Sequence, residues 1–378
     1  MKKTILFLTG TRADFGKLKP LIQVVGTSLD YEYKIFATGM HLLEKYGYTI
    51  NEIKKSGFTN IFPYMNQVSS DDMEVVLANT INGLSRFLHE SPVDLIVVHG
   101  DRVEALAGAT VGALRNTLVA HVEGGEISGT VDELMRHAIS KLSHVHFVAT
   151  EAAKNRLIQL GEDQRAIFHI GSPDVDAMLS DDLPSLVEAK KRYDIDFCSF
   201  AIAMLHPVTT EDRCTQEKHA KIFVESLLES GQNYVVIYPN NDLGSDVIFR
   251  AYEKLENIKN IKIFPSLRFE HFLVLLKHSS FIIGNSSAGI HEAPVYAIPT
   301  LNLGSRQNNR FKYESIFDLA FDKGQILQAI EQLKSLQSFS PCKRYGSGGS
   351  AQKFKAALGE LWSIQKQKQF KDIESENV

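Results

Sequence analysis

Acidic side chains follow two neighbouring strands of the expected sheet, and each lies close to a histidine. The apolar run 95–98 leads into the motif HGDR at 99–102, and the run 117–120 leads into HVEGGE at 121–126. Residues just past the carboxyl ends of parallel strands face the ligand crevice of an open sheet. Asp101 and Glu123 are therefore expected at one edge, with Asp132 and Arg136 at the start of the next helix. This concentration of ionisable groups favours proton-transfer chemistry.

The alternative is that these carboxylates have only structural roles, as helix caps and as ion-pair partners of Arg102 and Arg136. Three carboxylates that converge on one crevice favour chemistry, because like charges held together raise at least one pKa toward neutrality. His99 and His121 flank the carboxylates and are candidates for orienting them. His41 is a candidate ligand contact, whereas His144 and His146 are interpreted as structural.

The first strand-to-helix turn, TGTRADFGK at 9–17, has no GxGxxG dinucleotide fingerprint, so a nicotinamide site is disfavoured. A glycine turn at a helix start, with Arg12 and Lys17 nearby, suits phosphate binding. A plain turn with two solvated cations fits the spacing equally well.

The segment FIIGNSSAGIHEAP at 281–294 predicts a strand that ends in Gly284-Asn285-Ser286-Ser287 and then opens a helix. Backbone N–H groups and two hydroxyls at a helix start form an anion site. A buried Glu292 farther along would accept hydrogen bonds from both hydroxyls of a ribose. A serine helix cap with a surface glutamate is the alternative. His206 closes another strand and is expected at the carboxyl edge of the second sheet, the alternative being a partly buried structural histidine.

Short apolar strands alternate with amphipathic helices along nearly all of the 378 residues, which predicts an α/β protein with two parallel sheets and two domains. Gly and Pro at 171–174 suggest a hinge. We therefore expect an N-terminal domain at 1–171 and a C-terminal domain at 172–350. A C-terminal helix is expected at about 351–368, and the segment YGSGG at 345–349 is expected to be a mobile loop.

The composition is that of an ordinary globular protein, with 44% hydrophobic and 23% charged residues. A net charge of −4 disfavours nucleic-acid binding, and no apolar run approaches the length of a membrane span. The three scattered cysteines indicate neither a disulfide framework nor a metal site. The apolar run ILFL near the N-terminus is too short for a signal peptide, so a cytoplasmic location is expected.

At these motifs the chain resembles the hydrolysing UDP-N-acetylglucosamine 2-epimerases of sialic-acid biosynthesis, the NeuC type. The matching stretches are GTRADFGKLKP, TGMHL, HGDRVEALAGA, HVEGGEISGTVDELMRHAISKLSH, GSPDVD, HPVTTE, YPNND, GNSSAGIHEAP and GSRQNNR. The resemblance implies the GT-B fold, with two Rossmann-like domains, parallel sheets and an active-site cleft between them. It implies as well that the C-terminal helix at about 351–368 completes the first domain. It also implies that no nicotinamide cofactor and no catalytic metal is used, and that the protein is a homodimer or homotetramer.

The resemblance assigns acid/base roles to Asp101, Glu123 and Asp132, and places His206 near the leaving diphosphate. It places Ser286 and Ser287 at the phosphates and Glu292 at the ribose. It makes further residues candidate contacts to anions or to the uracil: Arg12, Lys17, Arg102, Arg136 and Arg306 for anions, and Arg268 and Phe269 for the uracil. His291 stands where relatives often carry arginine, and Glu133 is a possible second carboxylate beside Asp132.

The implied reaction converts UDP-N-acetylglucosamine and water to N-acetylmannosamine and UDP through a 2-acetamidoglucal. Relatives that act on UDP-N,N′-diacetylbacillosamine share these motifs, so that substrate stays open. A GT-B glycosyltransferase or a non-catalytic UDP-sugar binding protein is disfavoured by the set of carboxylates, although neither is excluded.

Overall fold

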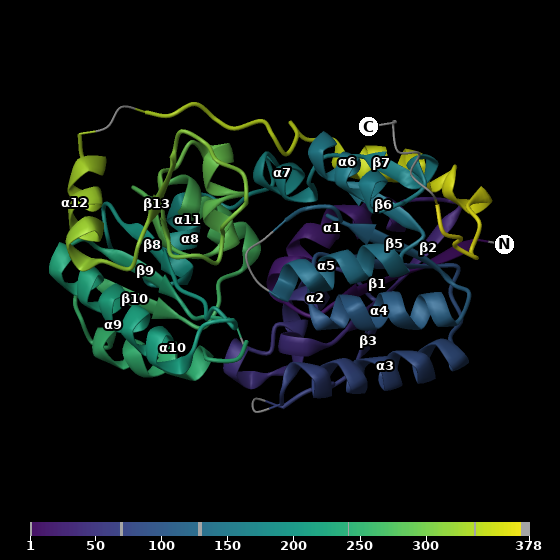
Figure 1. Ribbon diagram of the computed structural model, residues 1–378, viewed down its shortest axis with the longest axis horizontal. Coiled ribbons are helices and arrows are strands. Elements are labelled where there is room, and N and C mark those ends of the chain that lie inside the picture. The colour runs from purple at the N-terminus through teal and green to yellow at the C-terminus, as the bar shows by residue number, and fades with distance from the viewer. Residues whose placement is uncertain (1, 69–70, 128–130, 241, 336–337, 372–378) are drawn as a thin grey trace, which may run out of the picture. The chain divides into compact units, whose positions relative to one another are not determined.

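The computed structural model describes residues 2–68, 71–127, 131–240, 242–335 and 338–371. By their contacts, these residues divide into two compact units (Figure 1). Unit 1 contains the chain up to Glu126, the stretch Asp132–Leu179 and the chain from Arg344 onward, and unit 2 contains Ser180–Lys343. Residues 172–179 and 344–350 thus belong to unit 1, although the sequence suggested a C-terminal domain at 172–350.

Unit 1 is built on a seven-stranded sheet with the strand order β3-β2-β1-β4-β5-β6-β7, and every pairing in it is parallel. Its strands are β1 Lys3–Thr9, β2 Tyr31–Ala37, β3 Ile61–Pro63, β4 Leu95–His99, β5 Leu118–Val122, β6 Val145–Val148 and β7 Ile167–His169. Its helices are α1 Arg12–Gly26, α2 Ile50–Lys55, α3 Met73–Glu90, α4 Val103–Leu114, α5 Val131–Leu142, α6 Glu151–Gln159, α7 Pro173–Met178 and α13 Ser350–Leu358.

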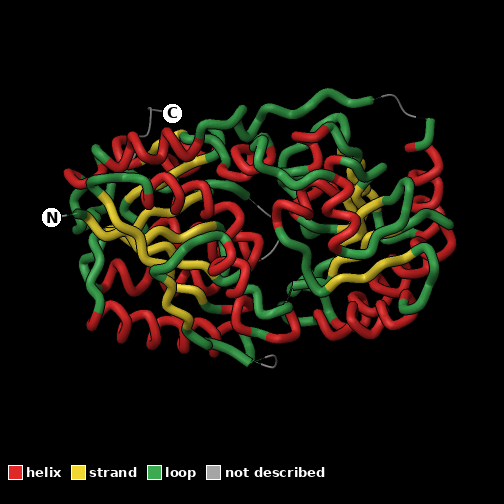
Figure 2. Tube along the Cα trace, turned by 180° about the vertical axis from the view of Figure 1, so that it is seen from behind, coloured by secondary structure: helices red, strands yellow, loops and turns green. Residues whose placement is uncertain are grey.

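Both faces of this sheet are buried, which explains why its strands read as continuous apolar runs. Ile5 and Phe7 of β1 pack with α1 and α13 on one face. Leu6 and Leu8 pack with α3 and α4 on the other face. Figure 2 shows the strands of the sheet with helices on both sides. The short edge strand β3 was not anticipated from the sequence.

Unit 2 repeats this plan with a six-stranded parallel sheet in the order β10-β9-β8-β11-β12-β13. Its strands are β8 Ala201–Met204, β9 Tyr234–Ile237, β10 Ile261–Phe264, β11 Ile282–Gly284, β12 Thr300–Leu303 and β13 Ile316–Leu319. Its helices are α8 Leu186–Arg192, α9 Arg213–Ser230, α10 Ser245–Tyr252, α11 Phe269–Lys277 and α12 Lys323–Leu333. The edge strand β13 was also missed.

The end of the chain differs from the single helix expected at about 351–368. The helix α13 ends at Leu358, and one further helical turn, Leu361–Ser363, follows it within the described part of the chain, which ends at residue 371. Gly359 follows directly, and glycine favours helix ends because it loses more conformational freedom than other residues in a helix. Tyr345, expected in a mobile loop, is buried and its carbonyl accepts a hydrogen bond from the Ser172 amide.

In each sheet the strand order reverses at one point, between β1 and β4 in unit 1 and between β8 and β11 in unit 2. Open α/β sheets bind ligands beside such reversals, outside the carboxyl ends of the strands. None of the helices that the structure describes is both long and apolar enough to cross a membrane.

Candidate functional site

Asp101 and Glu123 follow adjacent parallel strands of unit 1, as the sequence predicted. His99 of β4 is in register with Val122 of β5, so the two carboxylates leave the sheet side by side. Asp132 lies in the first turn of α5, also as predicted. Residues 128–130, which form part of the same sequence motif, lie outside the described residues.

Arg136 links this group of carboxylates. Its guanidinium is buried and forms an ion pair with Asp101. Burial disfavours the charged guanidinium and would lower the pKa of Arg136. The nearby carboxylates outweigh this effect, Asp101 most strongly, followed by Glu123 and Glu126, and raise that pKa above its usual value. Asp132 precedes Arg136 by one turn of α5, and residues four apart share a helix face.

Glu123 is held by contacts from several elements. Its Oε1 accepts a hydrogen bond of 2.7 Å from the Ser172 hydroxyl. Its Oε2 lies 3.2 Å from Nε2 of His99 and 3.8 Å from Nζ of Lys17. Its backbone is left-handed, with φ +63°. This conformation is uncommon outside glycine and clusters at functional sites.

Positively charged side chains lie beside the carboxylates of this edge. The sequence led us to expect that like charges held together raise the pKa of at least one carboxylate toward neutrality. In the structure Arg136 interacts with Asp101 and Glu123. Lys17 lies 3.8 Å from Glu123 and 2.7 Å from its closer partner Asp174. An opposite charge at this range favours ionised carboxylates.

The turn after β1 is shaped by a buried polar cluster. Thr11 caps α1 and forms a capping box with Asp14, which also accepts hydrogen bonds from the Gly10 amide and the Thr9 hydroxyl. His41 lies beneath this turn between the hydroxyls of Thr9 and Thr49. Burial lowers the pKa of His41 to about 4. His41 is therefore a neutral structural residue, and its assignment as a candidate ligand contact was wrong.

Arg12 begins α1 at this turn, where the sequence placed it. Arg102 precedes α4, and its Nε donates to Oε2 of Glu104 at 3.3 Å. The Glu104 side chain is buried and packs against Gly10. Sequence reasoning missed Glu104, although its place just after HGDR was a usable signal.

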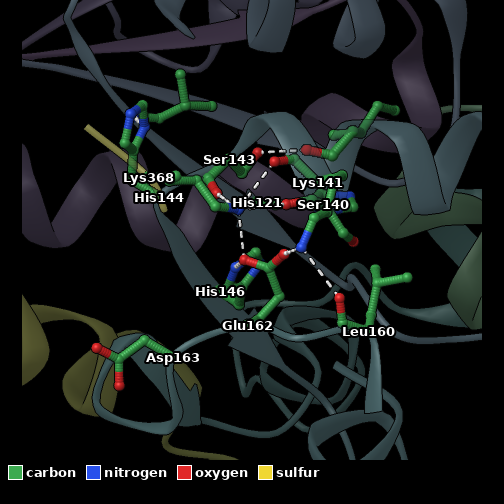
Figure 3. A network of polar contacts seen from close by, with 12 residues as sticks. His121, Ser140, Lys141, Ser143, His144, His146, Leu160, Glu162, Asp163 and Lys368 are labelled. Carbon is green, nitrogen blue, oxygen red and sulfur yellow. Dashed lines mark hydrogen bonds and ion pairs between the residues drawn. The ribbon is translucent and has the colours of Figure 1, made fainter. Parts of the chain in front are cut away.

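His121 is a structural residue that lies behind the turn after β4. Nε2 of His121 lies 2.7 Å from the carbonyl of Gly100. Its Nδ1 lies 3.0 Å from the hydroxyl of Ser140, and both residues are labelled in Figure 3. A carbonyl only accepts, so Nε2 carries the proton. Burial lowers the pKa of His121 to about 3 and keeps it neutral. Because Gly100 precedes Asp101, His121 helps to fix the turn that carries this carboxylate.

In unit 2, Asn285 ties together the two strands at the reversal of strand order. Its backbone N–H donates to the carbonyl of Met204. Its side-chain oxygen accepts from the backbone N–H of His206, and its side-chain nitrogen donates to the carbonyl of His206. Gly284 permits this approach, because its φ is +133° and a Cβ there would lie 1.9 Å from the Met204 carbonyl oxygen. Asn285 was not singled out from the sequence, although it belongs to the GNSS motif.

His206 lies at the carboxyl end of β8, as predicted. Its Nδ1 accepts a hydrogen bond of 3.1 Å from the Asn240 amide. The neutral ring must then carry its proton on Nε2, which makes that nitrogen a hydrogen-bond donor. This tautomer suits a contact to an anion.

The helix predicted after Gly284 is absent from the described structure. A single 3-10 turn, Ser287–Gly289, follows β11, and a second turn forms at Ala293–Tyr296. Pro294, which lacks an amide hydrogen, disfavours a continuous helix here. Ser286 caps the first turn by accepting from the Ala288 amide at 3.3 Å. Glu292 is 5% exposed, which rules out the reading as a surface glutamate.

Other predicted residues of unit 2 divide between two places. Arg306 donates to the carbonyl of Asn285 at 3.4 Å and so belongs with His206 and Ser286. Arg268 and Phe269 lie after β10 instead, where the Arg268 amide donates to the Tyr193 hydroxyl and Phe269 begins α11. Among the described residues, no group of His, Cys, Asp or Glu is arranged to hold a metal ion.

Comparisons with known proteins agree with this architecture. The family model described as UDP-N-acetylglucosamine 2-epimerase matches residues 25–359. The chain is 46% identical to the UDP-N-acetylglucosamine 2-epimerase of Neisseria meningitidis serogroup B, over 98% of this chain and 99% of the relative. It is 32% identical to the hydrolyzing UDP-N,N′-diacetylbacillosamine 2-epimerase of Legionella pneumophila, over 93% and 94% of the two chains.

Solved structures show the same fold at lower identity. The UDP-GlcNAc 2-epimerase of Methanocaldococcus jannaschii, in complex with UDP-GlcNAc and UDP, superposes with a TM-score of 0.79 at 22% identity, covering 95% of this chain and 100% of its own. A Neisseria meningitidis UDP-GlcNAc 2-epimerase bound to UDP-GlcNAc gives 0.77 at 18% identity, with 94% and 100% covered. The predicted α/β GT-B fold, with its two parallel sheets, is confirmed.

Proposed function

We propose a specific reaction for this chain, which belongs to the UDP-N-acetylglucosamine 2-epimerase family. It is a hydrolysing epimerase that converts UDP-N-acetylglucosamine and water to N-acetylmannosamine and UDP, for the synthesis of sialic acid or a related sugar acid. The 46% identity to the meningococcal relative supports this assignment over nearly the whole chain. The E. coli polysialic acid biosynthesis protein P7, at 30% identity, supports the pathway.

The reaction needs acid and base groups and no redox step. A base removes the C2 proton while the C1–O bond to UDP breaks, which gives the 2-acetamidoglucal. Water then adds its hydroxyl to C1, and a proton reaches C2 from the opposite face. One group that accepts and another that donates must therefore lie on different sides of the ring.

The arrangement of Asp101 and Glu123 is the observation that carries this proposal. Both follow adjacent strands and interact with Arg136. We assign proton transfer to Asp101, Glu123 and Asp132. Lys17 and Arg136 are held by carboxylates, so we assign them to the electrostatics of this edge as well as to contacts with the substrate anion. Arg12 and Arg102 lie on the neighbouring turns and are assigned to the same anion.

We assign the nucleotide to unit 2. The contact from the Asn240 amide to Nδ1 of His206 supports a neutral ring with its proton on Nε2. We assign this Nε2–H to the leaving diphosphate, where it stabilises the charge that develops. Ser286, Ser287 and Arg306 contact the phosphates, and the buried Glu292 accepts from the ribose hydroxyls. Arg268 and Phe269 are assigned to the uracil.

The protein is further proposed to be a cytoplasmic homo-oligomer with no nucleic-acid or membrane partner. Cys198, Cys214 and Cys342 are all unbridged, which fits a reducing compartment. The net charge of −4 disfavours nucleic-acid binding.

A second candidate substrate is UDP-N,N′-diacetylbacillosamine, because the Legionella relative carries that name at 32% identity. The two sugars differ at C4 and C6, and the higher identity to the meningococcal relative favours UDP-N-acetylglucosamine.

Incubation of the protein with each sugar nucleotide, followed by analysis of the released sugar and nucleotide, tests the proposal. We expect free N-acetylmannosamine and UDP from UDP-N-acetylglucosamine. Release of unchanged N-acetylglucosamine would indicate simple hydrolysis. A preference for the diacetylated sugar would establish the second candidate.

A further inference from the structure

Ser172, the residue that leads into the short helix α7, contacts Glu123 from outside the predicted catalytic motifs. Ser172 is buried, and its hydroxyl donates to Oε1 of Glu123 at 2.7 Å. The same hydroxyl oxygen accepts from the Asp174 amide at 3.3 Å and caps α7. A hydroxyl has one hydrogen to donate, and here it is directed to the carboxylate.

Several contacts within unit 1 fix the position of Ser172. Its amide donates to the Tyr345 carbonyl at 2.8 Å. Two residues along the chain, Asp174 pairs with Lys17 of α1. Asp176 accepts from the amides of Ser350 and Ala351 at 3.0 and 2.9 Å, which joins α7 to the start of α13. The hydroxyl that reaches Glu123 is therefore anchored to two other helices.

We propose that Ser172 is a positioning residue for proton transfer by Glu123. This inference rests on the proposed function, since it takes Glu123 as a carboxylate that moves the substrate proton. By occupying Oε1, Ser172 orients the carboxylate and leaves Oε2 on the side of His99 and Lys17. A donor to a carboxylate also stabilises its ionised form, which a base needs.

Other charged groups face Glu123 and keep their charges in Ser172→Ala. They are His99 from β4, Lys17 from α1, Arg136 from α5 and, through Lys17, Asp174 from α7. Ser172→Ala also removes the cap of α7, so the titration is compared with that of a second cap variant, Ser185→Ala.

The test is the pH profile of kcat/KM for Ser172→Ala. Loss of a hydrogen bond to a charged group shifts the carboxylate pKa upward by about one unit. We expect the acid limb of kcat/KM to move to higher pH by that amount. At pH values below the acid limb, kcat/KM of Ser172→Ala should be about tenfold lower than that of the wild type, while the affinity for UDP stays the same. Ser172→Thr retains the hydroxyl and should restore the wild-type profile.

Ser185→Ala is the matched control, because Ser185 caps α8 in the same way and its hydroxyl contacts Glu188. It should lower stability slightly without moving the acid limb. If Ser172→Ala shows the wild-type acid limb, or lowers the residual rate of Glu123→Gln as much as it lowers the wild-type rate, Ser172 only maintains the fold.

A direct titration separates this inference from the proposed function. The 13C carboxyl resonance of Glu123, assigned by its absence from Glu123→Gln, should titrate at higher pH in Ser172→Ala whether or not the substrate is correctly named. An unchanged titration overturns the positioning role. A wild-type protein that does not turn over UDP-N-acetylglucosamine overturns the proposed function instead.

Discussion

Two buried glutamates of unit 1, Glu123 and Glu162, have similar neighbours and different settings. Glu162 lies on the loop after α6 and accepts hydrogen bonds from His146 at 2.9 Å, from Lys141 at 3.1 Å and from Lys368 (Figure 3). Burial alone would raise its pKa, but His146 and then Lys368 lower it to about 2. Glu123 also lies beside a histidine and a lysine, yet it stands on a left-handed backbone at the carboxyl edge of the sheet.

The comparison teaches that burial and a histidine neighbour do not by themselves mark a catalytic carboxylate. The Glu162 network holds the segment around Lys368 against unit 1, because Lys368 also donates to the carbonyls of Lys141 and Ser143. Glu123 instead has a left-handed backbone, and such strain is typical of functional positions. We therefore expect substitutions of the two glutamates to have opposite effects on rate and stability.

The largest effect is expected for Glu123→Gln. This nearly isosteric change removes proton transfer, which is worth typically ~10²–10⁴-fold in rate. The free energy of unfolding and the affinity for UDP should change little, since the nucleotide is assigned to unit 2. Steady-state kinetics, thermal melting and calorimetry with UDP measure the three quantities. A variant with near wild-type turnover would remove Glu123 from the catalytic group.

Asp101→Asn and Asp132→Asn extend this test to the other two carboxylates. Each should reduce the rate in the same range. A variant that lacks only the group for water addition should still release UDP and the glycal, which NMR detects. Equal loss of both steps in every variant would show that the carboxylates do not divide the two steps.

Glu162→Gln should give the converse result. Removing one partner from a buried ion pair costs about 3–5 kcal/mol, because Lys368 is left with an uncompensated charge. Urea unfolding should show this loss, while kcat of the folded fraction remains near wild type. Truncation after Ser363, which removes Lys366 and Lys368, is the companion variant and should also destabilise unit 1. A large drop in kcat with unchanged stability would contradict the structural role of Glu162.

A smaller effect is expected in unit 2 for Ser286→Ala combined with Ser287→Ala. Each hydrogen bond to a charged group contributes roughly 1.5–3 kcal/mol, so the affinity for UDP should fall about tenfold or more. The chemical step should be less affected than in Glu123→Gln. Normal UDP binding by calorimetry would refute the phosphate assignment.

The pH dependence of stability sharpens the comparison further. The pKa of Glu162 is about 2 in the folded state against an ordinary value of 4.5, so its ionised form stabilises the fold above 4.5. This contribution is lost as the pH falls from 4.5 toward 2. The difference in unfolding free energy between wild type and Glu162→Gln should therefore be constant near pH 7 and narrower by about pH 3. A difference that does not narrow would argue against a depressed pKa.

The sequence predicted the residues that follow strand ends better than the contacts between distant segments. Glu123 and His206 were found because a parallel strand determines where the next residue lies. The pairs Ser172–Glu123 and Glu162–Lys368 join segments far apart in the chain, and no local periodicity records them. The segment after β11 was predicted as a helix because its serines resemble a cap, whereas Pro294 interrupts it.

The most direct measurement follows the C2 position of the sugar in D₂O, with wild type and Glu123→Gln compared by NMR. From UDP-N-acetylglucosamine, the wild-type protein should release N-acetylmannosamine that carries deuterium at C2, together with UDP. Glu123→Gln should exchange this position at least about a hundredfold more slowly. Released sugar that keeps its original C2 proton, or equal exchange by the two proteins, would contradict proton transfer by the carboxylates at this edge.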